Sequence, residues 1–314
     1  MKAIMIKRYG GPEVLELVDL PAPTPKDGEV IVKVAATSVN PVDWRIRDGD
    51  AKDYVRLKLP GILGCDLAGE IAAVGKDVTR FAVGDPVFAM MPHDWGAHAE
   101  LVPLAEDMVV KKPARLTMEE AAATPVAAMT ALLGLRKRGQ VKPGQHVLVN
   151  GASSAVGMAA VQIAKALGAS VTAVCSEASF DLVRGLGADQ LIDYRTTDFA
   201  AGDDRYDLVF DCIGNHPHGA CARVLTGSRV HVTTMPGIGT FVRQLFNPLF
   251  GVKVFGLITT GSGAELEFIR SLVESGKLRT VVDKVYPFAD VARAQEYSKT
   301  GRAKGKIVLT LAAS

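Results

Sequence analysis

The feature that most constrains the fold is a strand, a turn and a helix that follow one another between Val147 and Ala169. An apolar run leads into Gly151, small residues form a tight turn, and Gly157 opens an alanine-rich helical segment. Backbone N–H groups and the helix dipole at such a turn bind pyrophosphate, and small side chains let phosphate oxygens approach closely. Ser154 and Ala155 stand where a three-glycine fingerprint would continue, so a purely structural turn is the alternative. With the strands around it, the segment predicts a dinucleotide site.

Short β-branched runs alternate with helical segments through the second half of the chain. The candidate strands are 146–149, 170–174, 190–192, 208–211, 229–233 and 252–257. This alternation is typical of a parallel, doubly wound sheet. A helix at 264–275, a strand at 281–286, a helix at 291–298 and a strand at 306–311 exceed what six strands require. We therefore expect this tail to return to the first domain.

The first third of the chain has a different texture, with strands expected at 30–39, 67–74 and 86–90 and many turn residues between them. Thr117 and Glu120 form a capping-box pattern that predicts the start of an alanine-rich helix running toward Leu135. These patterns predict a β-rich first domain that ends near this helix.

Composition excludes several classes of protein. Lys and Arg number 36 and Asp and Glu 34, so a formal charge of +2 gives no single-signed field for nucleic acid or a membrane surface. Hydrophobic residues make up 48% of the 314, enough for a sizeable core. The longest apolar stretch, 121–135, is interrupted by Pro125 and is shorter than the ~20 residues of a membrane span. With no secretory pattern at the N-terminus, we expect a cytoplasmic protein.

The thiols and imidazoles give no pattern of a metal site. Two histidines, His216 and His218, flank Pro217, but no carboxylate or thiolate is arranged to complete a site, which favours a surface turn. Four widely spaced cysteines predict small buried side chains and no disulfide framework: Cys65, Cys175, Cys212 and Cys221.

The end of the second strand of the parallel sheet bears on the choice of dinucleotide. An NAD site usually has an acid about 20 residues past the glycines, but this strand ends in Cys175 and Ser176. Hydroxyls of Ser176 and Ser179, with Arg195 nearby, can bind a 2′-phosphate, whereas Glu177 opposes it. Ser176 also suits a helix N-cap. The pattern favours NADPH.

Several stretches occur in the order seen in medium-chain dehydrogenase/reductases: SVNPVDWRIRDG, GCDLAGEIAAVG, FAVGDPVFA, WGAHAELV, PVAAMTAL, NGASSAVG, LGADQLIDY and GKIVL. The chain resembles the zinc-free quinone oxidoreductase, or ζ-crystallin-like, branch of that superfamily. The resemblance implies an α/β protein in which a Rossmann domain, 125–260, is inserted into a GroES-like catalytic domain formed by 1–124 and 261–314.

The departures from zinc-dependent alcohol dehydrogenases concern the metal ligands. Asn40, Cys65 and Val126 stand at the three positions that carry catalytic ligands in those enzymes, and no cysteine lies between Cys65 and Cys175 to form a structural zinc lobe. The resemblance therefore implies a reaction without a metal.

The same resemblance implies a set of site residues. Asn40 and Asp43 would lie near the nicotinamide and substrate, although Asn40 also suits a turn and Asp43 a helix cap. Family members often carry an aromatic residue where this chain has Ala51, and Tyr54 is the candidate substitute as proton donor. The remaining residues implied in cofactor binding are Thr130, Gly151, Ala152, Ser153, Ala155, Val156, Gly157, Ser176, Ser179, Tyr194, Ile213, Thr234, Phe255 and Lys306.

The aromatic-rich segment 241–250 suits a substrate lid, a subunit contact or a buried helix face, of which the buried face is favoured. In similar proteins the next strand, here 252–257, pairs across a dimer, which implies a homodimer. The expected function is NADPH-dependent hydride transfer to a quinone or to a C=C bond conjugated to a carbonyl. The alternatives are an alcohol dehydrogenase of the same fold and a non-catalytic NADPH-binding structural or regulatory protein.

Overall fold

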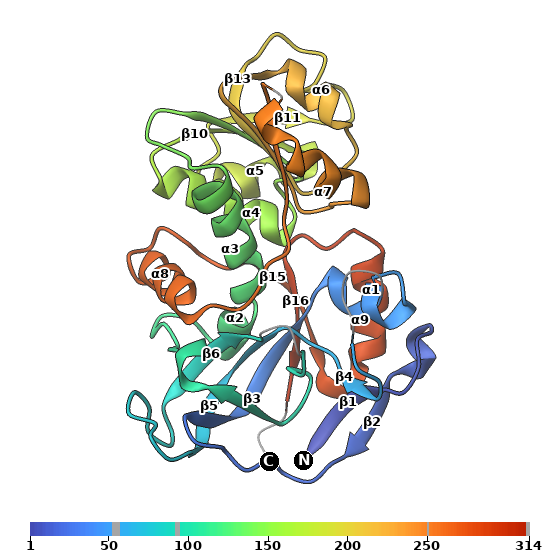
Figure 1. Cartoon of the computed structure of the whole chain (residues 1–314), viewed down its shortest axis with the longest axis vertical. Coiled ribbons are helices and arrows are strands. Elements are labelled where there is room, and N and C mark those ends of the chain that lie inside the picture. Colours follow the sequence, from blue (N-terminus) through green and yellow to red (C-terminus); the bar gives the residue numbers. More distant parts are fainter. Residues whose placement is uncertain (52–56, 92–94, 250, 312–314) are drawn as a thin grey trace. The chain divides into compact units, whose positions relative to one another are not determined.

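The computed structural model describes residues 1–51, 57–91, 95–249 and 251–311. The chain divides into two compact units (Figure 1). Unit 1 contains 1–126, 260–274 and 280–314, and unit 2 contains 127–259 and 275–279. The sequence-based boundaries were placed after 124 and 260, whereas these compact units divide after 126 and 259, and 275–279 belong to unit 2.

Unit 1 is built around one long strand, β3 (Glu29–Val39), in which every residue except Glu29, Lys33 and Ala35 is buried. The main sheet has the order β15-β16-β3-β5-β6-β8, with β7 also paired to β3, and every pair is antiparallel except β15 with β16. A second sheet has the order β2-β1-β4. The strands are β1 (Lys2–Ile6), β2 (Glu16–Asp19), β4 (Gly61–Ile62), β5 (Asp66–Val74), β6 (Pro86–Met90), β7 (Leu101–Ala105), β8 (Val109–Lys111), β15 (Val282–Pro287) and β16 (Lys306–Thr310).

Four helices accompany these sheets in unit 1. They are α1 (Pro41–Asp48), α2 (Met118–Ala122), α8 (Gly263–Glu274) and α9 (Val291–Lys299). In Figure 1, α9 lies beside α1, and the buried guanidinium of Arg47 donates to Gln295 Oε1 across this contact. The expected return of the chain's tail to the first domain accounts for β15, α9 and β16.

Unit 2 is the predicted parallel sheet. Its six strands have the order β11-β10-β9-β12-β13-β14, and every neighbouring pair is parallel. The order reverses between β9 and β12, which is where such sheets open a crevice for a dinucleotide. The strands are β9 (His146–Asn150), β10 (Ser170–Cys175), β11 (Gln190–Asp193), β12 (Tyr206–Asp211), β13 (Leu225–Thr233) and β14 (Lys253–Gly256).

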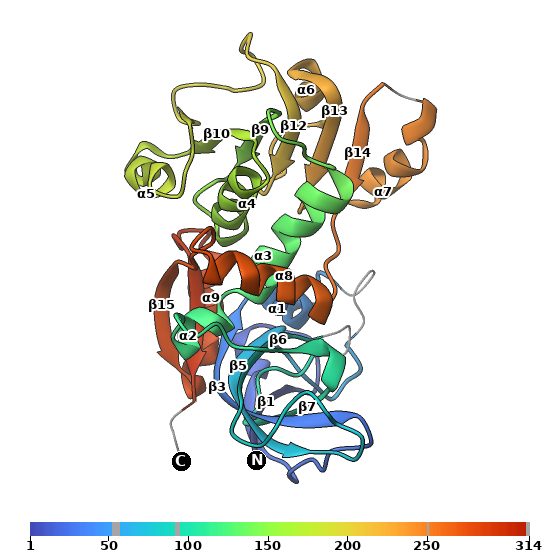
Figure 2. The ribbon, with the colours of Figure 1, turned by 90° about the vertical axis from the view of Figure 1, so that its left-hand side faces the viewer.

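The helices of unit 2 include α4 (Ala155–Ala166), α5 (Phe180–Arg184), α6 (His218–Arg223) and α7 (Ile238–Leu245). Figure 2 shows α4 against the sheet and α7 beside β14 at its edge. Alternating strands and helices confirm the predicted α/β fold class.

The long helix expected from Thr117 to Leu135 is interrupted, which corrects that prediction. The capping box is present, since Thr117 Oγ1 accepts from the Glu120 N–H, but α2 ends at Ala122. A separate helix, α3 (Pro125–Leu132), follows and continues as a π-helix to Arg138. Pro125 has no N–H to donate and disfavours helical geometry at the residue before it, so the helix restarts there.

The favoured interpretation of 241–250 as a buried helix face is wrong for the described part, 241–249. Three large apolar side chains of α7 and the turn after it are strongly exposed, with fractions of 78% for Leu245, 48% for Phe246 and 77% for Leu249. The polar side chains of Arg243 and Gln244 point inward instead, where they bond the backbone of Val252 and Gly256.

Candidate active site and dinucleotide cradle

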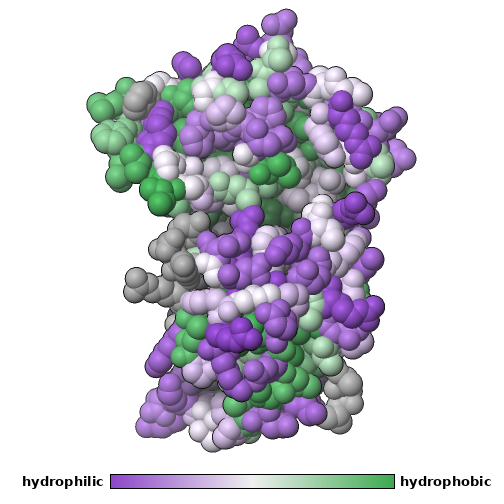
Figure 3. Space-filling model, turned by 90° about the vertical axis from the view of Figure 1, so that its right-hand side faces the viewer, coloured by the Kyte–Doolittle hydropathy of each residue, from purple (hydrophilic) through white to green (hydrophobic). Residues whose placement is uncertain are grey.

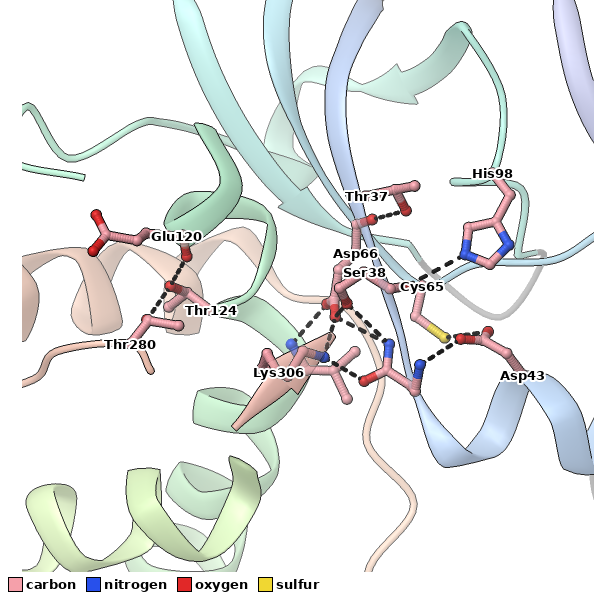
Figure 4. A network of polar contacts seen from close by, with 12 residues as sticks. Thr37, Ser38, Asp43, Cys65, Asp66, His98, Glu120, Thr124, Thr280 and Lys306 are labelled. Atoms are coloured by element: carbon pink, nitrogen blue, oxygen red, sulfur yellow. Dashed lines mark hydrogen bonds and ion pairs between the residues drawn. The ribbon is translucent and has the colours of Figure 1, made fainter. Parts of the chain in front are cut away.

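A buried polar cluster lies in unit 1 where three strands come together (Figure 4). The Lys306 ammonium donates to Asn40 Oδ1 at 2.6 Å and to Asp66 Oδ2 at 3.0 Å. Asn40 Nδ2 donates to the same Asp66 oxygen at 3.1 Å and to Ser38 Oγ at 3.3 Å. Asp66 is fully buried, and Asn40 and Lys306 are each 4% exposed. A charged pair is therefore held out of water by hydrogen bonds on every side.

Strand register places these side chains together. β16 pairs with β3 so that Val308 lies opposite Ser38, and β5 pairs with β3 so that Leu67 lies opposite Thr37. Lys306 at the start of β16 and Asp66 at the start of β5 are thereby placed beside the end of β3. The second oxygen of Asp66, Oδ1, accepts from the Val126 N–H at 2.8 Å.

Asp43 serves the start of α1. Its Oδ2 accepts from the Asn40 N–H at 2.7 Å, so the helix-capping role considered from the sequence is the contact observed. Its other oxygen lies 3.7 Å from the Cys65 sulfur. Burial raises the pKa of Asp43, and burial together with the Asp43 and Asp66 carboxylates raises the pKa of the Cys65 thiol well above its ordinary value. Cys65 is thus a thiol at neutral pH, unsuited to act as a nucleophile.

The donors of Asn40 are already engaged. Both N–H groups of its amide have acceptors in Asp66 and Ser38, and its oxygen accepts from Lys306. Lys306 has three N–H groups, and the described residues provide two acceptors for them. Asn40 is accordingly fixed in one amide orientation.

The glycine turn of unit 2 has the close packing that small residues permit. A Cβ on Gly157 would lie 2.2 Å from the Gly151 carbonyl oxygen, and one on Gly151, where φ is +81°, would lie 2.6 Å from Ile213. Ser154 caps α4, because its Oγ donates to the Gly151 carbonyl at 2.8 Å and accepts from the Gly157 N–H at 3.1 Å. The turn is therefore fixed before any ligand binds.

Not every predicted cradle residue offers an N–H group. Those of Gly151 and Ala152 both donate to the Val174 carbonyl. The N–H groups of Ser153, Ala155 and Val156 have no acceptor among the described residues, and the last two lie in the first turn of α4. The structure thus leaves three donors at a helix N-terminus, next to the strand-order reversal, which fits a pyrophosphate.

Two polar residues at this crevice, Asn150 and Asp211, were not predicted as site residues from the sequence. Asp211, at the end of β12, accepts from Asn150 Nδ2 at 2.8 Å and from the Ile213 and Gly214 N–H groups at 3.0 Å. Burial alone would raise the pKa of Asp211, but the nearby His231 imidazole and these donors lower it below its ordinary value. The sequence did contain a signal for them, because each is a polar residue at the end of a buried strand, β9 for Asn150 and β12 for Asp211.

The residues expected around the adenosine phosphate lie together only in part. Cys175 is paired with Asp193, so Ser176 and Tyr194 follow the ends of adjacent strands. Tyr194 is 57% exposed, whereas Ser179 is 2% exposed, with its hydroxyl 3.5 Å from that of Ser176. A cavity of about 500 Å³ opens beside them, with Glu177, Phe180, Leu191, Ile192, Asp193, Thr196 and Thr197 as its lining.

The other expected site residues are spread over both units. Thr130 on α3 shares a hydrogen bond with Thr259, and Ile213 and Thr234 follow β12 and β13. Phe255 lies on the edge strand β14, beneath the Arg138 guanidinium at 5.6 Å, with β12 and β13 between it and β9. Lys306 lies in the unit 1 cluster. Tyr54 lies outside the described residues.

The three positions that carry catalytic metal ligands in zinc-dependent alcohol dehydrogenases offer few atoms here that could bind a metal. Asn40 is engaged as above, Cys65 is buried, and Val126 contributes only its backbone N–H. Within 1–51, 57–91, 95–249 and 251–311, no three His, Cys, Asp or Glu side chains are grouped to hold a metal ion.

In the same ranges, no helix has the length and apolar character to cross a bilayer.

A GroES-like sheet unit and a doubly wound unit with a glycine turn define a two-domain dehydrogenase/reductase. Residues 26–114 match the alcohol dehydrogenase GroES-like domain, and 186–309 match the zinc-binding dehydrogenase domain. The chain is 36% identical to the chloroplast envelope quinone oxidoreductase homolog of Arabidopsis thaliana, covering 98% of both, and 33% identical to a quinone oxidoreductase of Sus scrofa, covering 99% and 98%. The structure of the quinone oxidoreductase from Coxiella burnetii matches with a TM-score of 0.87, 30% identity and 99% coverage of both chains. The chain belongs to the quinone oxidoreductases of the medium-chain dehydrogenase/reductase superfamily.

Proposed function

We propose that this protein transfers a hydride from NADPH to a quinone or to a C=C bond conjugated to a carbonyl. The observation that carries the proposal is the set of three unengaged N–H groups at the start of α4, where the strand order reverses. The acceptor class follows the relatives, which include the NADPH-dependent alkenal/one oxidoreductase of Arabidopsis thaliana, 34% identical over 98% of this chain and 79% of that protein.

The two units have separate tasks in this proposal. Unit 2 would be the dinucleotide-binding domain, in which the N–H groups of Ser153, Ala155 and Val156 would hold the pyrophosphate. The small residues Gly151 and Gly157 would allow its approach. Unit 1 is the catalytic domain, in which Asn40 is held by Lys306 and Asp66, and Asp43 holds the start of α1. When bound, the nicotinamide supplies the hydride. Fixed side chains in unit 1 would orient the acceptor, which is the protein's main contribution to such a reaction.

The test of the chemistry uses NADPH carrying deuterium at the transferable C4 position. With an enone acceptor we expect deuterium at the β-carbon of the product. Absence of deuterium there would exclude conjugate hydride transfer. Rapid reduction of simple ketones would favour the alcohol dehydrogenase alternative, and no turnover across a quinone and enone panel would favour the non-catalytic one.

The proposed reaction is independent of metal, because the three ligand positions offer one buried thiol where a catalytic zinc needs about three protein ligands. We expect full activity after dialysis against a chelator. Stoichiometric zinc that leaves together with the activity would refute this part.

The preference for NADPH over NADH is proposed from the missing acid at the end of β10. An Asp at Ser176 would repel a 2′-phosphate, so Ser176→Asp should raise the KM for NADPH and leave that for NADH nearly unchanged. Ser176→Asn is the matched control, since it changes the same side chain to nearly the same size without adding a negative charge. Equal catalytic efficiency of the wild type with both cofactors would contradict the preference.

The expected homodimer and cytoplasmic location stay predictions. Pairing of β14 across a dimer would require α7 to move, because side chains of that helix occupy the free edge of the strand. Sedimentation equilibrium tests the homodimer. Several relatives are named as chloroplastic or mitochondrial proteins, so imaging of the tagged full chain tests the location.

A further inference from the structure

The helix α7 is packed with its polar side toward the protein. Arg243 donates to the Val252 carbonyl at 2.8 Å, and the Gly256 N–H donates to Gln244 Oε1 at 3.1 Å. Asn247, just after the helix, pairs with both the N–H and the carbonyl of Val254 at 2.9 Å. These groups belong to alternate residues along the outer edge of β14. Side chains of α7 therefore take the place of a further strand.

The opposite side of α7 is apolar and faces outward. Ile238, Val242, Leu245 and Leu249 recur at helical spacing, and Phe246 adjoins them. Their exposed fractions are 73% for Ile238, 48% for Val242, 78% for Leu245, 48% for Phe246 and 77% for Leu249. Figure 3 shows hydrophobic side chains gathered at the upper left of the view, where α7 lies. We call these five residues the α7 face.

Cationic side chains lie at the strand that α7 covers, and acidic ones are absent from this stretch of sequence. No Asp or Glu occurs between Asp211 and Glu265. Arg229 lies against Gly251, with its guanidinium 3.5 Å from the Cβ position of that residue, and Arg243 reaches Val252. Lys253 on β14 is exposed, and Arg138 lies over Phe255 of the same strand. The overall charge of +2 hides this local segregation.

We propose that the α7 face docks on an anionic lipid bilayer. An amphipathic helix with Leu and Phe on one side and Arg or Lys at its border binds in the plane of a membrane surface, where apolar side chains enter the acyl region and cations meet lipid phosphates. This is binding at the surface, independent of the proposed reaction, and it requires no membrane-spanning helix.

Charge favours a bilayer over a second copy of this chain as the occupant. Two copies meeting through their α7 faces would bring two patches of the same sign close together, each containing Arg229 and Lys253. Like charges in such a contact repel, whereas phosphatidylglycerol or phosphatidylserine headgroups complement them.

The test is co-sedimentation of the full chain with vesicles of phosphatidylcholine alone and of phosphatidylcholine with phosphatidylglycerol at 3:1. We expect binding to the anionic vesicles that weakens with salt. Leu245→Ser with Leu249→Ser should reduce the partition coefficient about tenfold or more per leucine, and Arg229→Gln with Lys253→Gln about fivefold per charge.

Matched controls keep the result specific. Val83→Ser and Val285→Ser remove exposed apolar side chains from unit 1, and Lys26→Gln with Lys76→Gln removes two exposed charges; both sets should leave binding unchanged. Unchanged thermal unfolding of the α7 variants shows that they are folded. Failure of the wild type to bind anionic vesicles, or binding that survives the leucine substitutions, overturns the proposal. A dimer that dissociates in the leucine variants, without vesicle binding, also overturns it and identifies a second copy as the occupant.

Discussion

Replacing Lys306 with Met would leave the Asp66 carboxylate buried without its cation. Asp66 is fully buried, and the ammonium is one of three donors to its Oδ2, along with Ser38 and Asn40. Breaking a buried pair by removing one partner costs about 3–5 kcal/mol, because a charge remains out of water. For a unit of this size that corresponds to a fall in Tm of roughly 6–20 °C.

The partner substitution, Asp66→Asn, leaves the ammonium uncompensated and should cost a similar amount. Combining the two removes both charges, so the double variant should be more stable than the sum of the single effects by about 2–3 kcal/mol. Lys7→Met is the control, since the Lys7–Glu16 pair is exposed and should contribute far less.

The assay can report on unit 1 alone. Both tryptophans of the chain, Trp44 and Trp95, lie in that unit, so their fluorescence during urea unfolding measures its stability. Single effects that add to within about 0.5 kcal/mol would refute the coupling of the pair. A wild-type-like Lys306→Met variant would refute the burial argument itself.

Three further predictions concern single residues. Gly157→Ala should abolish NADPH binding in calorimetry because its Cβ would lie 2.2 Å from the Gly151 carbonyl, whereas Gly219→Ala, with open space around it, should bind normally. The pKa of Asp211 is lowered, so its charge stabilises the fold above about pH 3.8; Asp211→Asn should be destabilised at pH 7, and the difference should shrink in urea titrations as pH falls through the lowered pKa. The pKa of Asp43 is raised, so its charge costs stability above pH 3.8, and Asp43→Asn should gain on the wild type as pH rises.

The parallel strands of unit 2 and the strands β3, β5 and β6 of unit 1 were predictable because their signals are local. The other strands of the first third of the chain, β1, β2, β4, β7 and β8, were not predicted. The apolar run of β6 was expected at 86–90 and spans Pro86–Met90, and the parallel strands were found within a few residues of their predicted ends. The turn at Gly151 is equally local, since the residues that shape it lie within one strand, one turn and one helix. Which of its N–H groups stay unengaged depends on Val174 in the next strand, and the sequence pattern does not contain that contact.

The polar cluster of unit 1 could not be predicted from sequence patterns, because its members are far apart in the sequence. Lys306 and Asn40 are 266 residues apart, and Asp66 joins them through two different strand pairings. Periodicity places each residue on its own strand but does not determine which strands become neighbours. Only the resemblance assigned Asn40 and Lys306 to one cleft, and it did not predict that they would bond each other.

The helix α7 shows why an amphipathic pattern can be assigned the wrong way round. Spacing along 238–249 establishes that one side is apolar, and burial of that side is the usual outcome. Here the neighbouring element is an edge strand, whose outward N–H and carbonyl groups need partners and would otherwise invite another strand. Arg243, Gln244 and Asn247 can supply those partners, whereas leucine and phenylalanine cannot. The strand edge therefore selects the polar side of the helix, and the apolar side is left facing outward because the same helix cannot present both.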